Sequence, residues 1–101
     1  MKKIIYLILP CYNEQAVLES SANKLLDLID GLIRESIIDE RSKIYFINDG
    51  SDDDTWNIIE KIHRKNSIFC GIRLAHNVGH QNTILAGLIE LNKKAVSIRL
   101  K

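Results

Sequence analysis

The sequence predicts an α/β fold of three layers, in which helices cover both faces of a mostly parallel sheet of about four strands. Three observations support this expectation. Short apolar runs rich in β-branched residues alternate with longer segments whose apolar residues recur every three or four positions. The first run, Ile4 to Leu9, is unbroken, which is typical of a strand buried on both faces. Turn-forming polar residues follow the runs, and alternating strands and helices indicate parallel strands joined by right-handed crossovers.

The first strand and the first helix are expected near the amino terminus. Ile4 to Leu9 is the first apolar run, and Pro10 is expected to stop the strand. The helix that follows should cover Ala16 to about Ile33, because its apolar residues fall at steps of three and four along one face. This stripe contains Leu18, Ala22, Leu25, Leu26, Ile29 and Ile33.

The rest of the chain repeats the pattern. A second strand, Ile44 to Ile47, should end in the turn-forming segment Asn48 to Ser51. We expect Ser51 or Asp52 to cap a second helix, with the acids at 52–54 near the positive end of its dipole. The apolar side of this helix is expected to hold Trp56, Ile59 and Ile62. The remaining elements are expected to be a strand over Ile68 to Leu74, a helix over Gln81 to Leu91 and the start of a fourth strand over Ala95 to Ile98.

Length and composition indicate a single domain, residues 1–101. Of the 101 residues, 46% are hydrophobic and 27% are charged, which suits one globular core but not two. The net charge of +1 gives no basic face for nucleic acid or an anionic membrane. The apolar run after Lys2 and Lys3 is too short for a secretory signal or a membrane span. Because Cys11 and Cys70 form neither a disulfide framework nor a zinc spacing, we expect a reduced, cytoplasmic setting.

Polar residues gather in the loops that follow the expected strands. These loops are Pro10 to Glu14, Asn48 to Ser51 and Ala75 to Gln81. Ligands of an open parallel sheet bind outside the carboxyl ends of its strands, where such loops converge. The first loop has neither the GxGxxG turn of a dinucleotide site nor the GxxxxGK[ST] of a P-loop. A receiver domain needs acids directly after its first strand, and a flavodoxin needs a hydroxyl-rich loop there, so both are disfavoured.

Three side chains in these loops suit a nucleotide. Tyr12 offers a ring for stacking, Glu14 offers a hydrogen-bond acceptor, and Asp49 can accept a hydrogen bond from a base or a ribose. The alternative for the Asp49 loop is turn formation alone, since Asn and Asp favour such turns in any case.

Two clusters have some features of a metal site. Asp52 to Asp54 formally reads Asp-x-Asp, but acids at the start of a helix are explained by its dipole. His76 and His80 are four residues apart, but Gly79 lies between them and a third ligand is missing. We therefore expect neither a metal site nor another cofactor in this chain.

Three segments together resemble a known family. LILPCYNE at 7–14, IYFINDGSDDDT at 44–55 and LAHNVGHQNTILAGL at 74–88 resemble the amino-terminal half of a family 2 glycosyltransferase with the GT-A fold. Among these enzymes the segments are most similar to the polyprenyl-phosphate sugar transferases, such as dolichol-phosphate mannose synthase. The resemblance extends from Ile4 to about Ile98 and implies the Rossmann-like, nucleotide-binding half of that fold.

The resemblance also implies roles for individual residues. The nucleotide pocket would be lined by Pro10, Tyr12, Glu14, Asp49 and Ser51, with Asp49 bonded to the base. A loop near the donor diphosphate and sugar would include Asn77, Gly79 and His80. The family more often has Asp-Asp-Gly-Ser, so Asn48 is a departure from its pattern.

A larger departure stands at the carboxyl end. The family strand that begins like Ala95 to Ile98 continues into Asp-x-Asp, which holds Mg²⁺ or Mn²⁺, whereas Arg99, Leu100 and Lys101 stand here. The metal and the acceptor-binding half, with its catalytic base, are therefore expected only in a full-length enzyme. We expect no catalytic residue in this chain and no sugar transfer by it alone.

Two functions follow from this resemblance. A complete enzyme would transfer a hexose from a nucleoside-diphosphate sugar, most simply a UDP-sugar, to a polyprenyl phosphate or a similar acceptor. It would lie at the inner face of the membrane, with membrane contact only through the missing parts or the lipid acceptor. The alternative is a truncated, non-catalytic module with weak or no nucleotide binding, which forms a homodimer through the unfinished edge of its sheet.

Overall fold

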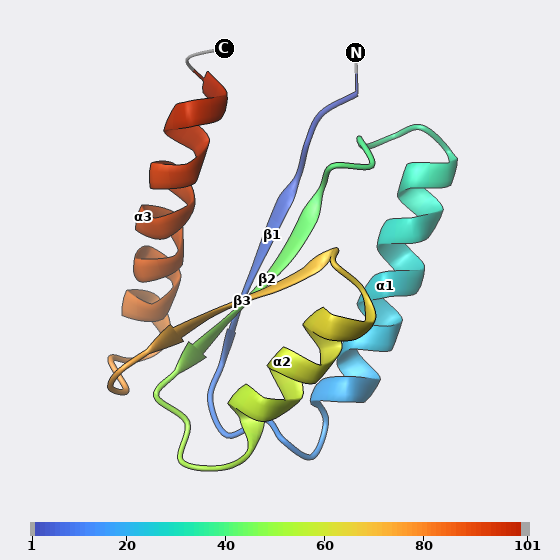
Figure 1. Cartoon of the computed structure of the whole chain (residues 1–101). Helices are drawn as coiled ribbons and strands as arrows, with labels where there is room; N and C mark the ends of the chain where they lie inside the picture. The colour runs from blue at the N-terminus through green and yellow to red at the C-terminus, as the bar shows by residue number, and fades with distance from the viewer. Residues whose placement is uncertain (1, 100–101) are drawn as a thin grey trace.

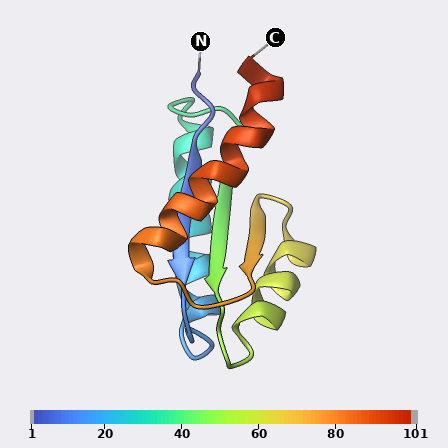
Figure 2. The ribbon, with the colours of Figure 1, turned by 90° about the vertical axis from the view of Figure 1, so that its left-hand side faces the viewer.

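The structure, a computed structural model, describes the backbone of residues 2–99 and the side chains of residues 2–91. Its parallel strands are β1 (Tyr6–Cys11), β2 (Lys43–Asp49) and β3 (Phe69–Leu74), paired in the order β1-β2-β3. Its helices are α1 (Leu18–Arg34), α2 (Thr55–Lys65) and α3 (His80–Arg99). Figures 1 and 2 show α1 and α2 on one face of the sheet and α3 on the other. The predicted three-layer α/β fold is confirmed.

The central strand β2 contributes to two cores, because its side chains alternate between the two faces of the sheet. Ile44 and Phe46 belong to the core that includes α1 and α2. Tyr45 and Ile47 belong to the core that includes Leu91 of α3. Each of these four residues is at most 7% exposed. Strand β2 is therefore buried on both faces. In β1, where the unbroken run Ile4 to Leu9 predicts the same, residues 6–10 are only half-buried, because this strand lies at an edge of the described sheet.

The two helices on the first face bury the apolar stripes that their spacing predicts. In α1 the buried residues are Leu18, Ala22 and Ile29, and Leu25, Leu26 and Ile33 pack partly buried beside them. In α2, Ile59 and Ile62 are buried and Trp56 is half-buried. Both stripes face the same core, which fixes how α1 and α2 lie on the sheet.

Strand β1 is longer at its carboxyl end than predicted. Pro10 does not stop it: this residue pairs with Ile47, and the strand continues to Cys11, which pairs with Asn48. A proline is tolerated here because β1 is an edge strand of the described sheet, where one side of the backbone needs no ladder partner. The register brings the first loop level with the turn after β2.

The expected fourth strand is wrong. Ala95 to Ile98 lie inside α3, and the described part of the chain has a sheet of three strands. After Gly87 the sequence has no Gly or Pro that would end a helix, and Leu, Lys and Ala are good helix formers. The unfinished edge expected at that strand is therefore absent from residues 2–99, where the free edges belong to β1 and β3.

The connection from β3 to α3 passes over the carboxyl ends of the strands. Figure 2 shows the chain leaving β3 and crossing to the opposite face of the sheet, where α3 contacts β1 and β2. Gly87 makes this packing close, since a Cβ there would lie 3.0 Å from Cγ1 of Ile47. The route brings the loop between β3 and α3 across the end of β2.

Candidate functional site

A cavity of about 260 Å³ opens at the carboxyl ends of β1 and β2. Its walls are the first loop on one side and the loop before α3 on the other. The lining residues are Pro10, Cys11, Tyr12, Glu14, Asp49, Asn77, Gly79 and His80. The structure thus brings together every residue predicted for the site except Ser51. The cavity lies where an open parallel sheet places its ligands.

Asp49 joins the two walls of this cavity. Its side chain is buried, with 4% of its surface exposed. The backbone N–H of Val78 donates to Oδ1 at 2.8 Å, and that of Gly79 donates to Oδ2 at 3.2 Å. Each carboxylate oxygen has two acceptor positions, so both oxygens keep the capacity for one further donor.

Glycine at position 50 allows the loop to lie this close to the end of β2. Gly50 has φ +63°, in the left-handed region that favours glycine. A Cβ at this position would lie 2.4 Å from the backbone nitrogen of Asn77. Any larger residue would therefore push the loop away from Asp49.

The wall formed by the first loop carries one exposed aromatic ring and one carboxylate. Tyr12 is 44% exposed, so its ring is available to a flat ligand, and Glu14 is half-buried beside it. Cys11 is buried at the base, where burial, and then the charge of Glu14, raises the pKa of its thiol to about 12. The thiol is protonated at neutral pH and is no nucleophile there.

The charge of the lining favours a donor of hydrogen bonds over a bare anion. Glu14 and Asp49 are acidic, and among the side chains of residues 2–91 no lysine or arginine lines the cavity. Carboxylates suit the N–H groups of a base and the hydroxyls of a ribose, whereas a diphosphate would need a cation.

Ser51 is hydrogen-bonded to the first loop and does not line the cavity. Its Oγ accepts a hydrogen bond from the backbone N–H of Asn13 at 3.0 Å and donates to the side chain of Asn48. Sequence reasoning missed Asn13, Gln15 and Thr55, whose contacts join the first loop to the turn after β2. Their polar character and their nearness to the predicted site were the only signals available.

The predicted start of α2 is also wrong. The helix begins at Thr55 with Asp54 at the N-cap position, and neither Ser51 nor Asp52 caps it. The acids at 52–54 precede the helix instead of occupying its first turn. Asp53 accepts hydrogen bonds from the hydroxyl and from the backbone N–H of Thr55, and these bonds, that of the hydroxyl foremost, lower the pKa of its carboxyl.

The described residues do not fit a divalent cation. Among the side chains of residues 2–91, no group of three or more His, Cys, Asp or Glu could hold a metal ion. The two oxygens of Asp49 face the amides of Val78 and Gly79, and those of Asp53 face Thr55 and the amide of Gln15. Leu100 and Lys101, which stand where the family motif would continue, lie outside the described residues.

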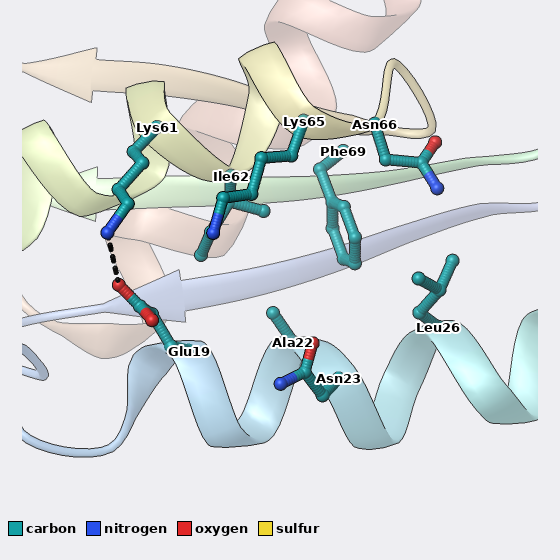
Figure 3. Close-up of a pocket in the computed structure, with 9 residues that line it drawn as sticks. All are labelled: Glu19, Ala22, Asn23, Leu26, Lys61, Ile62, Lys65, Asn66 and Phe69. Carbon is teal, nitrogen blue, oxygen red and sulfur yellow. Dashed lines mark hydrogen bonds and ion pairs between the residues drawn. The ribbon is translucent and has the colours of Figure 1, made fainter.

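A second cavity, of about 240 Å³, lies between α1 and α2 (Figure 3). An ion pair of 3.4 Å between Lys61 and Glu19 spans it, and Ile62 and Phe69 contribute apolar surface. Since Phe69 is the first residue of β3, this groove lies by the amino end of that strand, away from the converging loops. The carboxyl-end cavity is therefore the stronger candidate.

No helix in the described part of the chain is both long enough and apolar enough to cross a membrane.

Comparisons with known proteins identify the family of this chain. Residues 6–97 match the family model of glycosyl transferase family 2. The uncharacterized glycosyltransferase YkoT of Bacillus subtilis (strain 168) is 42% identical over 85 residues, which are 84% of this chain and 25% of that protein. The poly-beta-1,6-N-acetyl-D-glucosamine synthase of Staphylococcus aureus (strain COL) is 33% identical over 84 residues, which are 83% of this chain and 18% of that protein.

The chain thus spans about a quarter or less of the length of these curated relatives. No solved structure gives a significant match. The family model covers nearly the whole chain, including the three strands and the loops that form the cavity. The chain therefore belongs to glycosyl transferase family 2.

Proposed function

We propose that the cavity at the ends of β1 and β2 binds the nucleoside part of a nucleoside-diphosphate sugar. The observation that carries this proposal is the placement of Asp49, a buried carboxylate that lines the cavity and retains acceptor capacity. Asp49 accepts a hydrogen bond from the base, Glu14 accepts one from the ribose, and the ring of Tyr12 stacks on the base. A uracil nucleotide is the simplest ligand, because its ring carries a single N–H for Asp49.

The diphosphate and sugar extend toward the loop before α3 in this proposal. Asn77, Gly79 and His80 line that side of the cavity, and His80 is the first residue of α3. Partial positive charge at the start of a helix favours a phosphate. Without a metal ion this contribution is small, so we expect a Kd weaker than about 0.1 mM for UDP.

We assign sugar transfer itself to a full-length enzyme that contains this domain, and not to these 101 residues alone. Both relatives carry names of sugar transfer or sugar-polymer synthesis, which supports the donor class. The polyprenyl phosphate acceptor is proposed from the sequence resemblance, and a growing polysaccharide is the alternative that the Staphylococcus relative suggests. The metal and the acceptor site would come from the part of the relatives that this chain does not span.

Titration with UDP and GDP, followed by amide NMR shifts, tests the binding proposal. The largest shifts are expected at residues 11–14, 49 and 77–80, and Asp49→Asn should weaken binding at least about tenfold because a charged acceptor is lost. Asp27→Asn is the matched control, since Asp27 is an exposed acid on α1. Shifts confined to the groove of Figure 3 would contradict the assignment.

Self-association of a non-catalytic module is a second candidate, favoured by one observation. Leu85, Leu88 and Ile89 form an apolar stripe on α3 and are each about half exposed, at 54%, 51% and 49%. Stripes of this kind commonly mark contact surfaces. Light scattering at about 100 µM should then report a dimer, and Leu88→Lys should return the protein to a monomer; a monomeric parent chain would remove this candidate.

A further inference from the structure

Three consecutive backbone amides of the first loop are each held by a side chain of the turn after β2. The N–H of Asn13 donates to Oγ of Ser51 at 3.0 Å, and the N–H of Glu14 donates to Oγ1 of Thr55 at 3.0 Å. The N–H of Gln15 donates to Oδ2 of Asp53 at 3.4 Å. Residues about 40 positions apart in sequence are thereby fixed against each other.

The contact is reciprocal. Oδ1 of Asn13 accepts a hydrogen bond from the backbone N–H of Asp52 at 2.9 Å, and Oε1 of Gln15 accepts one from that of Asp54 at 3.0 Å. Five hydrogen bonds therefore join the two loops. We call this set, between Asn13 to Gln15 and Ser51 to Thr55, the loop clamp.

Thr55 is the central residue of the loop clamp. It is fully buried, and its hydroxyl donates to Oδ1 of Asp53, so its lone pairs remain for the N–H of Glu14. The carbonyl of Glu14 in turn accepts from the backbone N–H groups of Val17 and Leu18, at 3.1 and 3.0 Å. Both backbone groups of Glu14 are therefore fixed, which sets the direction of its side chain.

Asn13 gives the loop its shape. Its φ of +50° is left-handed, a conformation that Asn tolerates better than most residues, and its side-chain amide is held by Asp52. Tyr12 and Glu14, on either side of it, both line the cavity, while Asn13 does not. The bend at Asn13 thus places two lining residues together.

We propose that Thr55, assisted by Ser51 and Asp53, is a positioning residue for nucleotide binding. None of the three lines the cavity, yet they hold the loop that presents Tyr12 and Glu14 opposite Asp49. Affinity for the nucleotide depends on this placement, because a ligand pays less to bind a loop that is already ordered. The inference rests on the proposed function of the cavity.

The test compares hydroxyl-bearing and hydroxyl-free variants at Thr55. Thr55→Val keeps the shape and removes the hydroxyl. It should raise the Kd for UDP of the folded protein about two- to tenfold, the value of the one hydrogen bond that this hydroxyl makes to the first loop. Thr55→Ser restores the hydroxyl and should bring the Kd back to within about twofold of the parent. Urea unfolding, measured in parallel, establishes that each variant is folded during the titration.

Two matched serine variants distinguish an effect on loop position from an effect on stability. They also provide the test if Thr55→Val does not fold. Ser51→Ala removes the acceptor of the Asn13 amide, and Ser42→Ala removes that of the Ile5 amide, a bond of 2.9 Å at the opposite end of the sheet. Only Ser51→Ala should weaken UDP binding. Equal Kd values for folded Thr55→Val, Ser51→Ala and the parent would overturn the inference, whereas absence of UDP and GDP binding by the parent chain would overturn the proposed function.

Discussion

The backbone N–H of Val78 donates a hydrogen bond of 2.8 Å to Oδ1 of Asp49, 29 positions earlier in the sequence. This bond, together with that from Gly79, fixes the loop before α3 to the end of the central strand. The carboxylate of Asp49 therefore has two structural roles: it lines the cavity, and it holds the loop before α3 in place.

Removal of this carboxylate should loosen the loop. Asp49→Ala leaves the amides of Val78 and Gly79 without their acceptor, which costs about 1–3 kcal/mol where the groups stay buried. Hydrogen exchange followed by NMR should show faster exchange at these two amides. Asp52→Ala is the control, since Asp52 is an exposed acid of the neighbouring turn and exchange at residues 78 and 79 should be unaffected by it.

The core beneath α1 and α2 should be sensitive to a cavity at Phe46. This side chain is 1% exposed, and its ring stacks on that of Phe69 with a centroid distance of 5.7 Å. Phe46→Ala should lower the free energy of unfolding, measured by urea denaturation, by about 3–5 kcal/mol. Leu28→Ala, at a position 58% exposed, should change it by less than about 0.5 kcal/mol. Similar losses in both variants would contradict the assigned core.

Low pH should break the ion pair between Asp39 and Arg41. Hydrogen bonds from the Arg41 side chain, and then from its backbone, lower the pKa of this carboxyl from 3.8 to about 2. Because the folded pKa is the lower one, the associated stabilisation is present above pH 4 and is lost as the pH falls toward 2. Arg41→Ala should return the pKa, measured by NMR titration, toward 3.8, and Arg34→Ala should leave it unchanged.

The two thiols should differ in reactivity. Cys11 is buried with its pKa raised to about 12, so it is almost entirely protonated at pH 8, whereas Cys70 is only half-buried. Iodoacetamide at pH 8 should alkylate Cys70 first in the folded protein and both residues in urea. Mass spectrometry of Cys70→Ser would show slow labelling of Cys11; rapid labelling would contradict its burial.

The gathering of the candidate residues at one edge of the sheet could be predicted, because it depends on local signals. Turn residues after apolar runs indicate strand ends, and parallel strands bring these ends together, so Tyr12, Glu14 and Asp49 could be placed on one edge from the sequence. The start of α2 could not, because Ser51, one of the two expected caps, bonds to the side chain of Asn48 and to the distant backbone N–H of Asn13 instead of capping a helix. Which of several polar residues takes a long-range partner is decided by tertiary packing.

The errors at the strands have a similar origin. Pro10 reads locally as a stop, but an edge position accommodates it beside Ile47. Ala95 to Ile98 reads as an apolar, β-branched start of a strand, but the preceding helix continues through it. In both places the neighbouring structure overrides the local preference of the sequence.

The loop clamp also has a consequence for the order in which the cavity is built as the chain is synthesised. All of its partners lie within the first 55 residues, whereas the amides that bind Asp49 belong to residues 78 and 79. Because a nascent chain emerges from its amino end, the wall that contains Tyr12 and Glu14 can form while Asp49 is still hydrated. The segment between β3 and α3 can then replace part of that water with its two amides and complete the other wall, so we expect the two walls of the cavity to form at different times during translation.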